Sequence, residues 1–366
     1  MTNKPLIMIA AGGTGGHMFP AQALAEEMLD RGWQVKLSTD LRGKHYATEF
    51  PKKVIIETVK SSTFSRGGLK SKILTPILII LGVLDAMRSI NKHKPSIIVG
   101  FGGYPAVPAL LAGGLKKIPR IIHEQNGILG RVNKLFAKKV QIVVCGSWPT
   151  ELPKNIKSIH IGNPVRNKVL KYASSQYIAP GDWPLSLLVI GGSQGSSIVS
   201  KITAEAVTLL PENLRMNLRV ACQVRKEDSY KIEKIFLDSK VDAEIQEFFQ
   251  DVPMRMSQAQ LVISRAGASS IADISIIGRP SILIPFAAAT NDHQRANSMG
   301  LVEVGAADVI NENELTPKKL ADCIEKILSS DQLASKMAKA ALKQSKPNAA
   351  NEFADLIEAT IRNNQK

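Results

Sequence analysis

Residues 6–16, LIMIAAGGTGG, and residues 187–197, LLVIGGSQGSS, share one pattern: an apolar run, a glycine-rich turn and the start of a helical pattern. An uninterrupted apolar strand that leads through glycine into a helix is typical of a parallel sheet covered on both faces. Because the pattern occurs once in each half of the 366-residue chain, we expect an α/β protein with two Rossmann-like, doubly wound parallel-sheet domains.

Short apolar runs alternate with helical patterns along both halves of the chain. Further strands are expected at 33–38, 54–59, 97–100, 120–123, 141–145, 158–161, 219–223, 261–264, 281–285 and 308–310. Helices are expected at 21–30, 196–210 and 316–328, the last with a Thr N-cap and Pro at the first helical position. If the carboxyl ends of the two sets of strands face each other, they form a cleft.

The boundary between the domains is expected near GNPVR, residues 162–166, before a weakly patterned stretch. The N-terminal domain should span 1–163 and the C-terminal domain 164–345. Lys346 and Pro347 interrupt the helical pattern near the end of the chain. We therefore expect a C-terminal helix, at about 346–366, that returns to the N-terminal domain.

The formal net charge of +15 comes from 47 Lys and Arg against 32 Asp and Glu. Residues 1–163 carry 23 of the basic and 9 of the acidic residues, and the rest carries 24 and 23. This asymmetry indicates that the first half contacts a nucleic acid or an anionic membrane, although a merely solvated basic surface has the same composition.

Three cysteines exclude a disulfide scaffold. No apolar run approaches the ~20 residues of a membrane-spanning helix, and no secretory signal is recognisable, so the expected protein is soluble or peripheral.

The turn GGTGGH, residues 12–17, lets a ligand approach the backbone at the start of a helix, where an anion is favoured. It lacks the Lys of a phosphate-binding P-loop and the third glycine of a dinucleotide fingerprint. His17 is a candidate base or hydrogen-bond donor; the alternative is a tight turn with a capping histidine.

Three more turns carry polar groups at predicted strand ends. GGSQG, residues 191–195, suits a phosphate or diphosphate. SRAGASS, residues 264–270, is followed by Asp273, a candidate for binding ribose hydroxyls. HEQNG, residues 123–127, groups His123, Glu124 and Asn126. The alternatives are a short turn that needs glycine for GGSQG, an N-cap serine with a first-turn Asp for SRAGASS and a polar loop for HEQNG. No Cys/His spacing indicates a metal site.

The stretch at 73–84, ILTPILIILGVL, is apolar and is flanked on both sides by Lys and Arg. An apolar segment between cations is typical of a helix that lies on an anionic lipid surface. A buried core helix with charged ends explains the same pattern.

Taken in order, GGTGGH, GGY at 102–104, HEQNG, GNPVR, GGSQG, SRAGASS and His293-Gln294 resemble the MurG family of peptidoglycan glycosyltransferases over nearly the whole chain. The resemblance implies a GT-B fold and an inverting transfer of GlcNAc from UDP-GlcNAc to the C4 hydroxyl of MurNAc in lipid I (undecaprenyl-diphospho-MurNAc-pentapeptide), giving lipid II. It also implies a peripheral enzyme on the cytoplasmic face of the bacterial inner membrane, with no cofactor, no metal and no nucleic acid as partner. The anionic membrane surface is an expected partner, and contact with other cell-wall synthesis proteins is left open.

The resemblance assigns donor contacts to matching positions of this chain. The sugar is assigned to Asn126 and Gln294, the diphosphate to Arg166 and Ser193, and the ribose to Asp273. The remaining donor contacts are assigned to Thr14, Gly15 and Gly16, to Phe249 for uracil, and to Ala268, Ser269, Ser270, Ile271 and Ala272 around the nucleoside.

The expected reaction needs one base, because inversion takes place by a single in-line attack. His17 is the first candidate and Glu124 the second. The chain departs from the family at Asp273, where Glu is frequent, and at His293, where Gln is frequent. A shorter carboxylate at 273 could loosen the ribose contact.

Three alternatives are weighed against this interpretation. One is another GT-B enzyme that uses UDP-GlcNAc, such as a 2-epimerase or a glycolipid transferase. A second is an NAD-dependent oxidoreductase with Asp40 as its ribose-binding acid, which the missing third glycine disfavours. A third is a nucleic-acid-binding protein, which the aromatic content of 5% disfavours.

Overall fold

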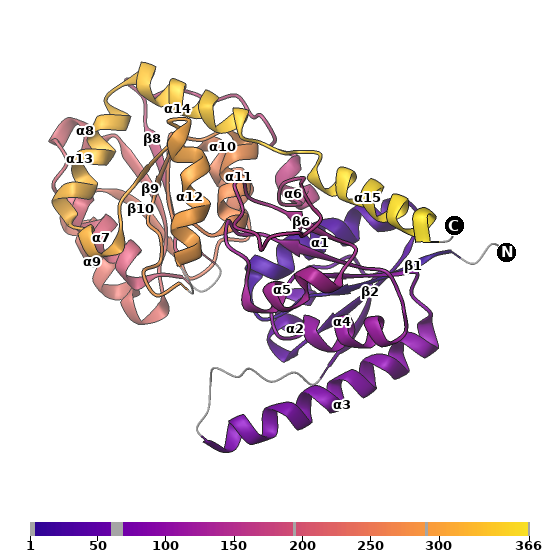
Figure 1. The fold of residues 1–366 in the computed structure, drawn as a ribbon. Helices are drawn as coiled ribbons and strands as arrows, with labels where there is room; N and C mark the ends of the chain where they lie inside the picture. The colour runs from indigo at the N-terminus through magenta and orange to yellow at the C-terminus, as the bar shows by residue number, and fades with distance from the viewer. Residues whose placement is uncertain (1–3, 60–68, 193–194, 290–291, 365–366) are drawn as a thin grey trace. The chain divides into compact units, whose positions relative to one another are not determined.

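The structure is a computed structural model that describes residues 4–59, 69–192, 195–289 and 292–364, and for residues 69–78 only the backbone. The chain forms two compact units: unit 1 comprises Met1–Asn167 and Asn348–Lys366, and unit 2 comprises Lys168–Pro347. Each unit contains one sheet in which every strand pair is parallel. The two doubly wound α/β domains expected from the sequence are thereby confirmed (Figure 1).

Unit 1 has a seven-stranded sheet in the order β3-β2-β1-β4-β5-β6-β7. Its strands are β1 (Leu6–Ala10), β2 (Gln34–Thr39), β3 (Ile55–Thr58), β4 (Ile97–Gly100), β5 (Arg120–Glu124), β6 (Ile142–Cys145) and β7 (Ser158–His160). Its helices are α1 (Gly15–Asp30), α2 (Leu41–Ala47), α3 (Leu69–His93), α4 (Ala106–Leu115), α5 (Arg131–Phe136), the 3-10 turn η1 (Ala137–Lys139), α6 (Asn167–Leu170), which straddles the unit boundary, and α15 (Ala349–Asn364).

Both faces of this sheet are covered. Along β1, Ile7 and Ile9 belong to a core shared with α1 and α15. Met8 and Ala10 belong to a second core shared with α3, α4 and α5. Strands buried on both sides are continuous apolar runs, which is why the first strand was recognisable in the sequence.

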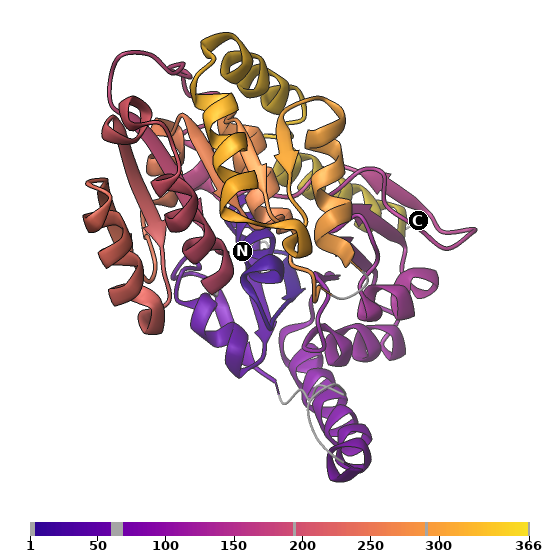
Figure 2. The ribbon, with the colours of Figure 1, turned by 90° about the vertical axis from the view of Figure 1, so that its left-hand side faces the viewer.

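Unit 2 has a six-stranded sheet in the order β10-β9-β8-β11-β12-β13. Its strands are β8 (Leu185–Ile190), β9 (Leu218–Gln223), β10 (Asp242–Gln246), β11 (Leu261–Ser264), β12 (Ser281–Leu283) and β13 (Ala307–Val309). Its helices are α7 (Ser197–Thr208), α8 (Glu212–Met216), η2 (Lys226–Asp228), α9 (Ser229–Asp238), α10 (Val252–Gln258), α11 (Ala268–Ile277), α12 (His293–Glu303), η4 (Glu312–Glu314), α13 (Pro317–Leu328) and α14 (Asp331–Lys343). Figure 2 gives a second view of the helices that cover this sheet.

The strand order of each sheet reverses direction beside its first strand. In unit 1 the reversal lies between β1 and β4, and in unit 2 between β8 and β11. Ligands of open α/β sheets bind outside the carboxyl ends of the strands at this switch point. The turns that follow these four strands are GGTGGH, GFGGY, GGSQG and SRAGASS, so the topology selects the same motifs that the sequence singled out.

Helix α15 confirms the expected return of the chain end to unit 1. Phe353, Ala354 and Ile357 are fully buried in the core that contains β1. On the rim, the guanidinium of Arg31, the C-cap of α1, lies 2.7 Å from the Asp355 carboxylate and donates a hydrogen bond to the carbonyl of Asn351. An apolar face and a polar edge thus fasten the helix to α1.

Several strands and α7 differ from their predicted ranges by one or two residues at their ends, and α1 and β10 differ more. Helix α1 begins at Gly15, before the predicted start at residue 21, and continues through Pro20, although a proline inside a helix removes one backbone hydrogen bond and crowds the preceding turn. Strand β10 was not predicted, since its five residues, DAEIQ, alternate between exposed and half-buried positions at a sheet edge.

Candidate functional site

The GGTGGH turn is held by its backbone. Gly13 has φ +88°, a left-handed conformation that favours glycine. Its N–H donates to Asp40 Oδ1 at 3.1 Å, and the same oxygen accepts from Gly43 N–H at 2.8 Å. A Cβ on Gly12 would lie 2.6 Å from Pro105 Cγ, so a side chain cannot be accommodated there. Asp40 therefore anchors the turn, which weighs against the ribose-binding role of the oxidoreductase alternative.

His17 is half-buried in the first turn of α1. Its Nδ1 lies 3.1 Å from the carbonyl oxygen of Gly12, which can only accept a hydrogen bond. This contact places the proton of a neutral ring on Nδ1 and makes Nε2 the basic nitrogen. Gly102 and Gly103, both with positive φ, pack against the ring: a Cβ on Gly102 would lie 3.4 Å from Nε2.

Glu124 is buried at the end of β5 and both carboxylate oxygens accept hydrogen bonds. Oε1 accepts from the Asn126 backbone and side-chain amides at 3.1 and 2.9 Å. Oε2 accepts from Gly130 N–H at 2.8 Å and from Asn133 Nδ2 at 2.9 Å. The carboxylate thus fixes the Asn126 side chain and the first turn of α5.

The HEQNG cluster divides into buried and accessible residues. His123 is fully buried, and burial lowers its pKa to about 4, so it is neutral near pH 7. Asn126 is half-buried. Arg166 of GNPVR is mostly buried, with its guanidinium 3.9 Å from the centroid of the Phe19 ring of α1. Unit 1 therefore holds Thr14, Gly15, Gly16, His17, Glu124, Asn126 and Arg166 of the predicted site.

In unit 2 the turn after β8 also requires glycine. A Cβ on Gly191 would lie 2.3 Å from the backbone nitrogen of Ser196, and Gly192 and Gly195 have positive φ. The turn leads to Ser196 at the N-cap of α7. Ser193, to which the diphosphate contact is assigned, lies outside the described residues.

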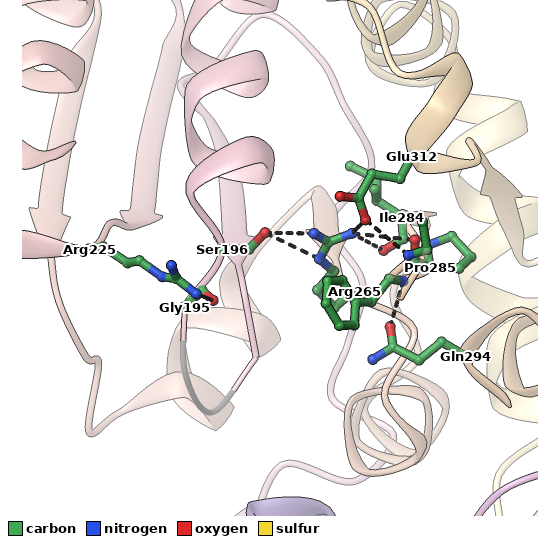
Figure 3. Close-up of polar contacts among 10 residues, drawn as sticks. Gly195, Ser196, Arg225, Arg265, Ile284, Pro285, Gln294 and Glu312 are labelled. Carbon is green, nitrogen blue, oxygen red and sulfur yellow. Dashed lines mark hydrogen bonds and ion pairs between the residues drawn. The ribbon is translucent and has the colours of Figure 1, made fainter. Parts of the chain in front are cut away.

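Arg265, which follows β11, connects this turn to the segments that follow β12 and β13 (Figure 3). Arg265 is 6% exposed, and its guanidinium donates to Ser196 Oγ at 2.9 and 3.2 Å. One nitrogen, Nη1, also donates to the Glu312 carboxylate at 2.7 Å and to the carbonyls of Ile284 and Pro285 at 3.3 Å. Sequence reasoning did not select Arg265 or Glu312, although an arginine between small residues in SRAGASS was visible.

Glu312 and Gln294 hold the segment that follows β12. Glu312 accepts from Ala287 N–H at 3.0 Å, and Gln294 Oε1 accepts from Phe286 N–H at 3.0 Å (Figure 3). Burial raises the pKa of Glu312, but the Ala287 N–H and the Arg265 charge outweigh burial and hold this pKa below its usual value. Glu312 also binds Arg265, and Arg265 binds Ser196. The segment after β12, which Gln294 contacts, is therefore connected to the turn after β8.

Helix α11 places the predicted nucleoside contacts on consecutive positions. Ala268 is buried, and Ser269, Ser270, Ile271, Ala272 and Asp273 are half-buried. Asp273 follows Ser269 and Ser270 by four and three positions, so the three side chains share a helix face. Phe249 is 2% exposed, with the Arg255 guanidinium 4.4 Å from its ring centroid, and its contact with uracil stays a prediction.

Helix α3 exposes apolar side chains. Ile80, Leu81 and Leu84 are 59%, 43% and 45% exposed, while Ala86 and Ile90 are buried in the core shared with α4. Figure 1 shows the C-terminal part of α3 beside α4 and its N-terminal part extending past it. Within the described ranges, no helix is long and apolar enough to cross a membrane, and no group of three His, Cys, Asp or Glu is placed to hold a metal ion.

Comparison with protein-family models gives two matches. Residues 7–145 match the glycosyltransferase family 28 N-terminal domain, and residues 186–357 match the glycosyltransferase family 28 C-terminal domain. Together the two matches cover most of both units.

Similar curated proteins share one name, UDP-N-acetylglucosamine--N-acetylmuramyl-(pentapeptide) pyrophosphoryl-undecaprenol N-acetylglucosamine transferase. The protein of Caulobacter vibrioides (strain NA1000 / CB15N) is 42% identical over 362 residues, which are 98% of this chain and 99% of that protein. The protein of Phenylobacterium zucineum is 40% identical over 97% of this chain and 98% of its own length.

Solved structures have the same fold. The crystal structure of Acinetobacter baumannii MurG has a TM-score of 0.78 at 27% identity, covering 98% of this chain and all of that chain. A putative UDP-N-acetylglucosamine 2-epimerase from Listeria monocytogenes has a TM-score of 0.69 at 14% identity, with 99% and 98% covered. The second likeness concerns the fold alone.

Proposed function

The chain belongs to glycosyltransferase family 28, and we propose from this premise that it transfers GlcNAc from UDP-GlcNAc to the C4 hydroxyl of MurNAc in lipid I, giving lipid II. The observation that carries this proposal is the 42% identity, over almost the full length of both chains, to a protein named for this transfer. The fold of this chain is the GT-B fold, with two Rossmann-like units. A shared fold alone does not separate this activity from that of a 2-epimerase, so the proposal rests on the identity to the named transferase.

We propose that unit 2 binds the donor. The turn after β8, the helix face with Asp273 and the segment held by Gln294 all follow the carboxyl ends of its strands. The N-terminus of α7 favours an anion at this turn, which suits the diphosphate, and the carboxylate of Asp273 suits the ribose hydroxyls. Unit 1, with its excess of basic residues, takes the lipid-linked acceptor.

His17 is proposed as the base that removes the proton of the attacking hydroxyl. The contact of its Nδ1 with Gly12 leaves Nε2 as the basic nitrogen, and histidine is the side chain that most often serves as a general base. Glu124 is a weaker candidate, because its oxygens already accept four hydrogen bonds. We assign Glu124 to holding Asn126, which in turn contacts the GlcNAc hydroxyls.

The leaving UDP gains negative charge as the bond to GlcNAc breaks. We propose that Arg166 and the backbone at the start of α7 stabilise this charge, because a preorganised cation and a helix N-terminus act on charge where it develops. Arg166 is mostly buried against Phe19, so its guanidinium is held in one place before the donor arrives.

We further propose that the protein binds the cytoplasmic face of the bacterial inner membrane as a peripheral protein. Ile80, Leu81 and Leu84 of α3 supply an exposed apolar surface, and the basic residues of the first half supply attraction to anionic lipid. The acceptor is anchored in the same leaflet by its undecaprenyl chain.

The deciding experiment incubates the protein with radiolabelled UDP-GlcNAc and a lipid I analogue, and analyses the products. We expect a β-linked GlcNAc-MurNAc disaccharide, formed equally in the presence of EDTA. A parallel incubation without acceptor tests for epimerised UDP-sugar. Absence of the disaccharide, or conversion of the donor that needs no acceptor, would refute the proposal.

A further inference from the structure

Three buried aromatic rings lie behind the HEQNG turn, and one of them comes from the end of the chain. The His123 ring centroid lies 5.2 Å from that of Phe101, which follows β4, at an interplanar angle of 36°. On α15, the Phe353 ring stacks on His123 at 5.5 Å and 29°. All three side chains are fully buried. The C-terminal helix therefore reaches the carboxyl end of β4, which borders the switch point of unit 1, and that of its neighbour β5.

The hydrogen bonds of His123 define its tautomer. The Gln125 amide nitrogen donates to the carbonyl oxygens of Phe101 and His123 at 3.1 and 3.2 Å, which fixes the orientation of that amide. It also lies 3.1 Å from His123 Nδ1, so Nδ1 accepts. The proton is then on Nε2, 3.1 Å from the carbonyl oxygen of Gly162, which can only accept.

This tautomer links two motifs that are far apart in the sequence. Gly162, with φ +101°, opens GNPVR, and Asn163 Nδ2 donates to the Gln125 carbonyl at 3.1 Å. One position after Gln125 comes Asn126, and GNPVR ends in Arg166. A turned or tilted His123 ring would leave the buried carbonyl of Gly162 without the hydrogen bond from Nε2, and burial makes such a loss costly.

We propose that Phe353 is a positioning residue for sugar transfer: by stacking on His123 it keeps the HEQNG and GNPVR segments in register, and so presents Asn126 and Arg166 to the donor. The proposal rests on the proposed function, which assigns those two residues to UDP-GlcNAc. Phe353 acts through His123 and has no contact with substrate in this account.

The test compares Phe353→Leu with Ile357→Ala in the full chain. Leucine keeps most of the apolar volume but removes the aromatic face, whereas Ile357, equally buried one turn later, loses more packing and no ring contact. We expect Phe353→Leu to lower kcat about tenfold or more with a KM for UDP-GlcNAc within about twofold of the wild type. Ile357→Ala should have nearly the wild-type kcat, although it lowers the unfolding temperature further.

The second readout is independent of activity. Nitrogen-15 NMR of the His123 ring should show the pure Nε2–H tautomer in the wild type and in Ile357→Ala, and a mixture in Phe353→Leu. An unchanged tautomer in Phe353→Leu, or a kcat that follows thermal stability across the three proteins, would overturn the inference. A wild-type protein that forms no disaccharide would instead refute the proposed function.

Discussion

At the scale of single residues, the contact between His17 Nδ1 and Gly12 O allows the structural role of His17 to be tested separately from its role as a base. In His17→Gln the side-chain amide can still donate to Gly12, but no basic nitrogen remains. If His17 is the base, both His17→Ala and His17→Gln should lower kcat about 10²–10⁴-fold, with little change in the KM for UDP-GlcNAc. Steady-state kinetics measure this, and a nearly wild-type kcat in His17→Gln would show that the ring has only a structural role.

Asp273 is the second residue with a separable role. Loss of hydrogen bonds to a carboxylate should raise the KM for UDP-GlcNAc roughly tenfold or more in Asp273→Ala, with a smaller effect on kcat. Asp273→Glu restores the carboxylate with one extra methylene and should keep a low KM. The initial rate of each variant is measured as a function of the UDP-GlcNAc concentration. An unchanged KM in Asp273→Ala would show that Asp273 does not bind the ribose.

At the scale of elements, α3 carries the prediction about the membrane. Replacing Ile80, Leu81 and Leu84 by Ser removes exposed apolar surface without opening a core, so folding should be unaffected. Binding to vesicles rich in anionic lipid should weaken at least about tenfold. Vesicle sedimentation measures the change, with Leu237→Ser on α9, where the leucine is 74% exposed, as the control. Equal retention of both variants would show that α3 is not the membrane-binding element.

Individual elements also show how far the sequence could lead. Strand β4 was predicted with its observed bounds, and Thr316 caps α13 as expected, its Oγ accepting from Lys319 N–H. Both features depend only on residues that are neighbours in the sequence. Arg265 was missed as a site residue because its partners Ser196 and Glu312 are 69 and 47 positions away. Only the folded sheet brings them together, and the role of His123 was hidden for the same reason.

At the scale of the whole molecule, the buried His123 makes stability depend on pH. Its pKa is about 4 in the folded protein and near 6.5 in the unfolded chain. Between these values the unfolded chain binds more protons, so the free energy of unfolding falls as the pH drops from 6.5 to 4, by on the order of 3 kcal/mol. Urea unfolding of wild type and His123→Gln across this range measures it. Parallel pH profiles for the two proteins would contradict the prediction.

The return of α15 to unit 1 also has a consequence for the order of synthesis. Unit 2 is one continuous stretch of chain, Lys168–Pro347, whereas unit 1 is completed by Asn348–Lys366. On the ribosome, unit 2 can close its core while the chain is still attached. Unit 1 receives Phe353 and Ile357 only after all of unit 2 has been synthesised. The domain that is begun first is therefore finished last, and a nascent chain that stops before residue 348 leaves His123 uncovered.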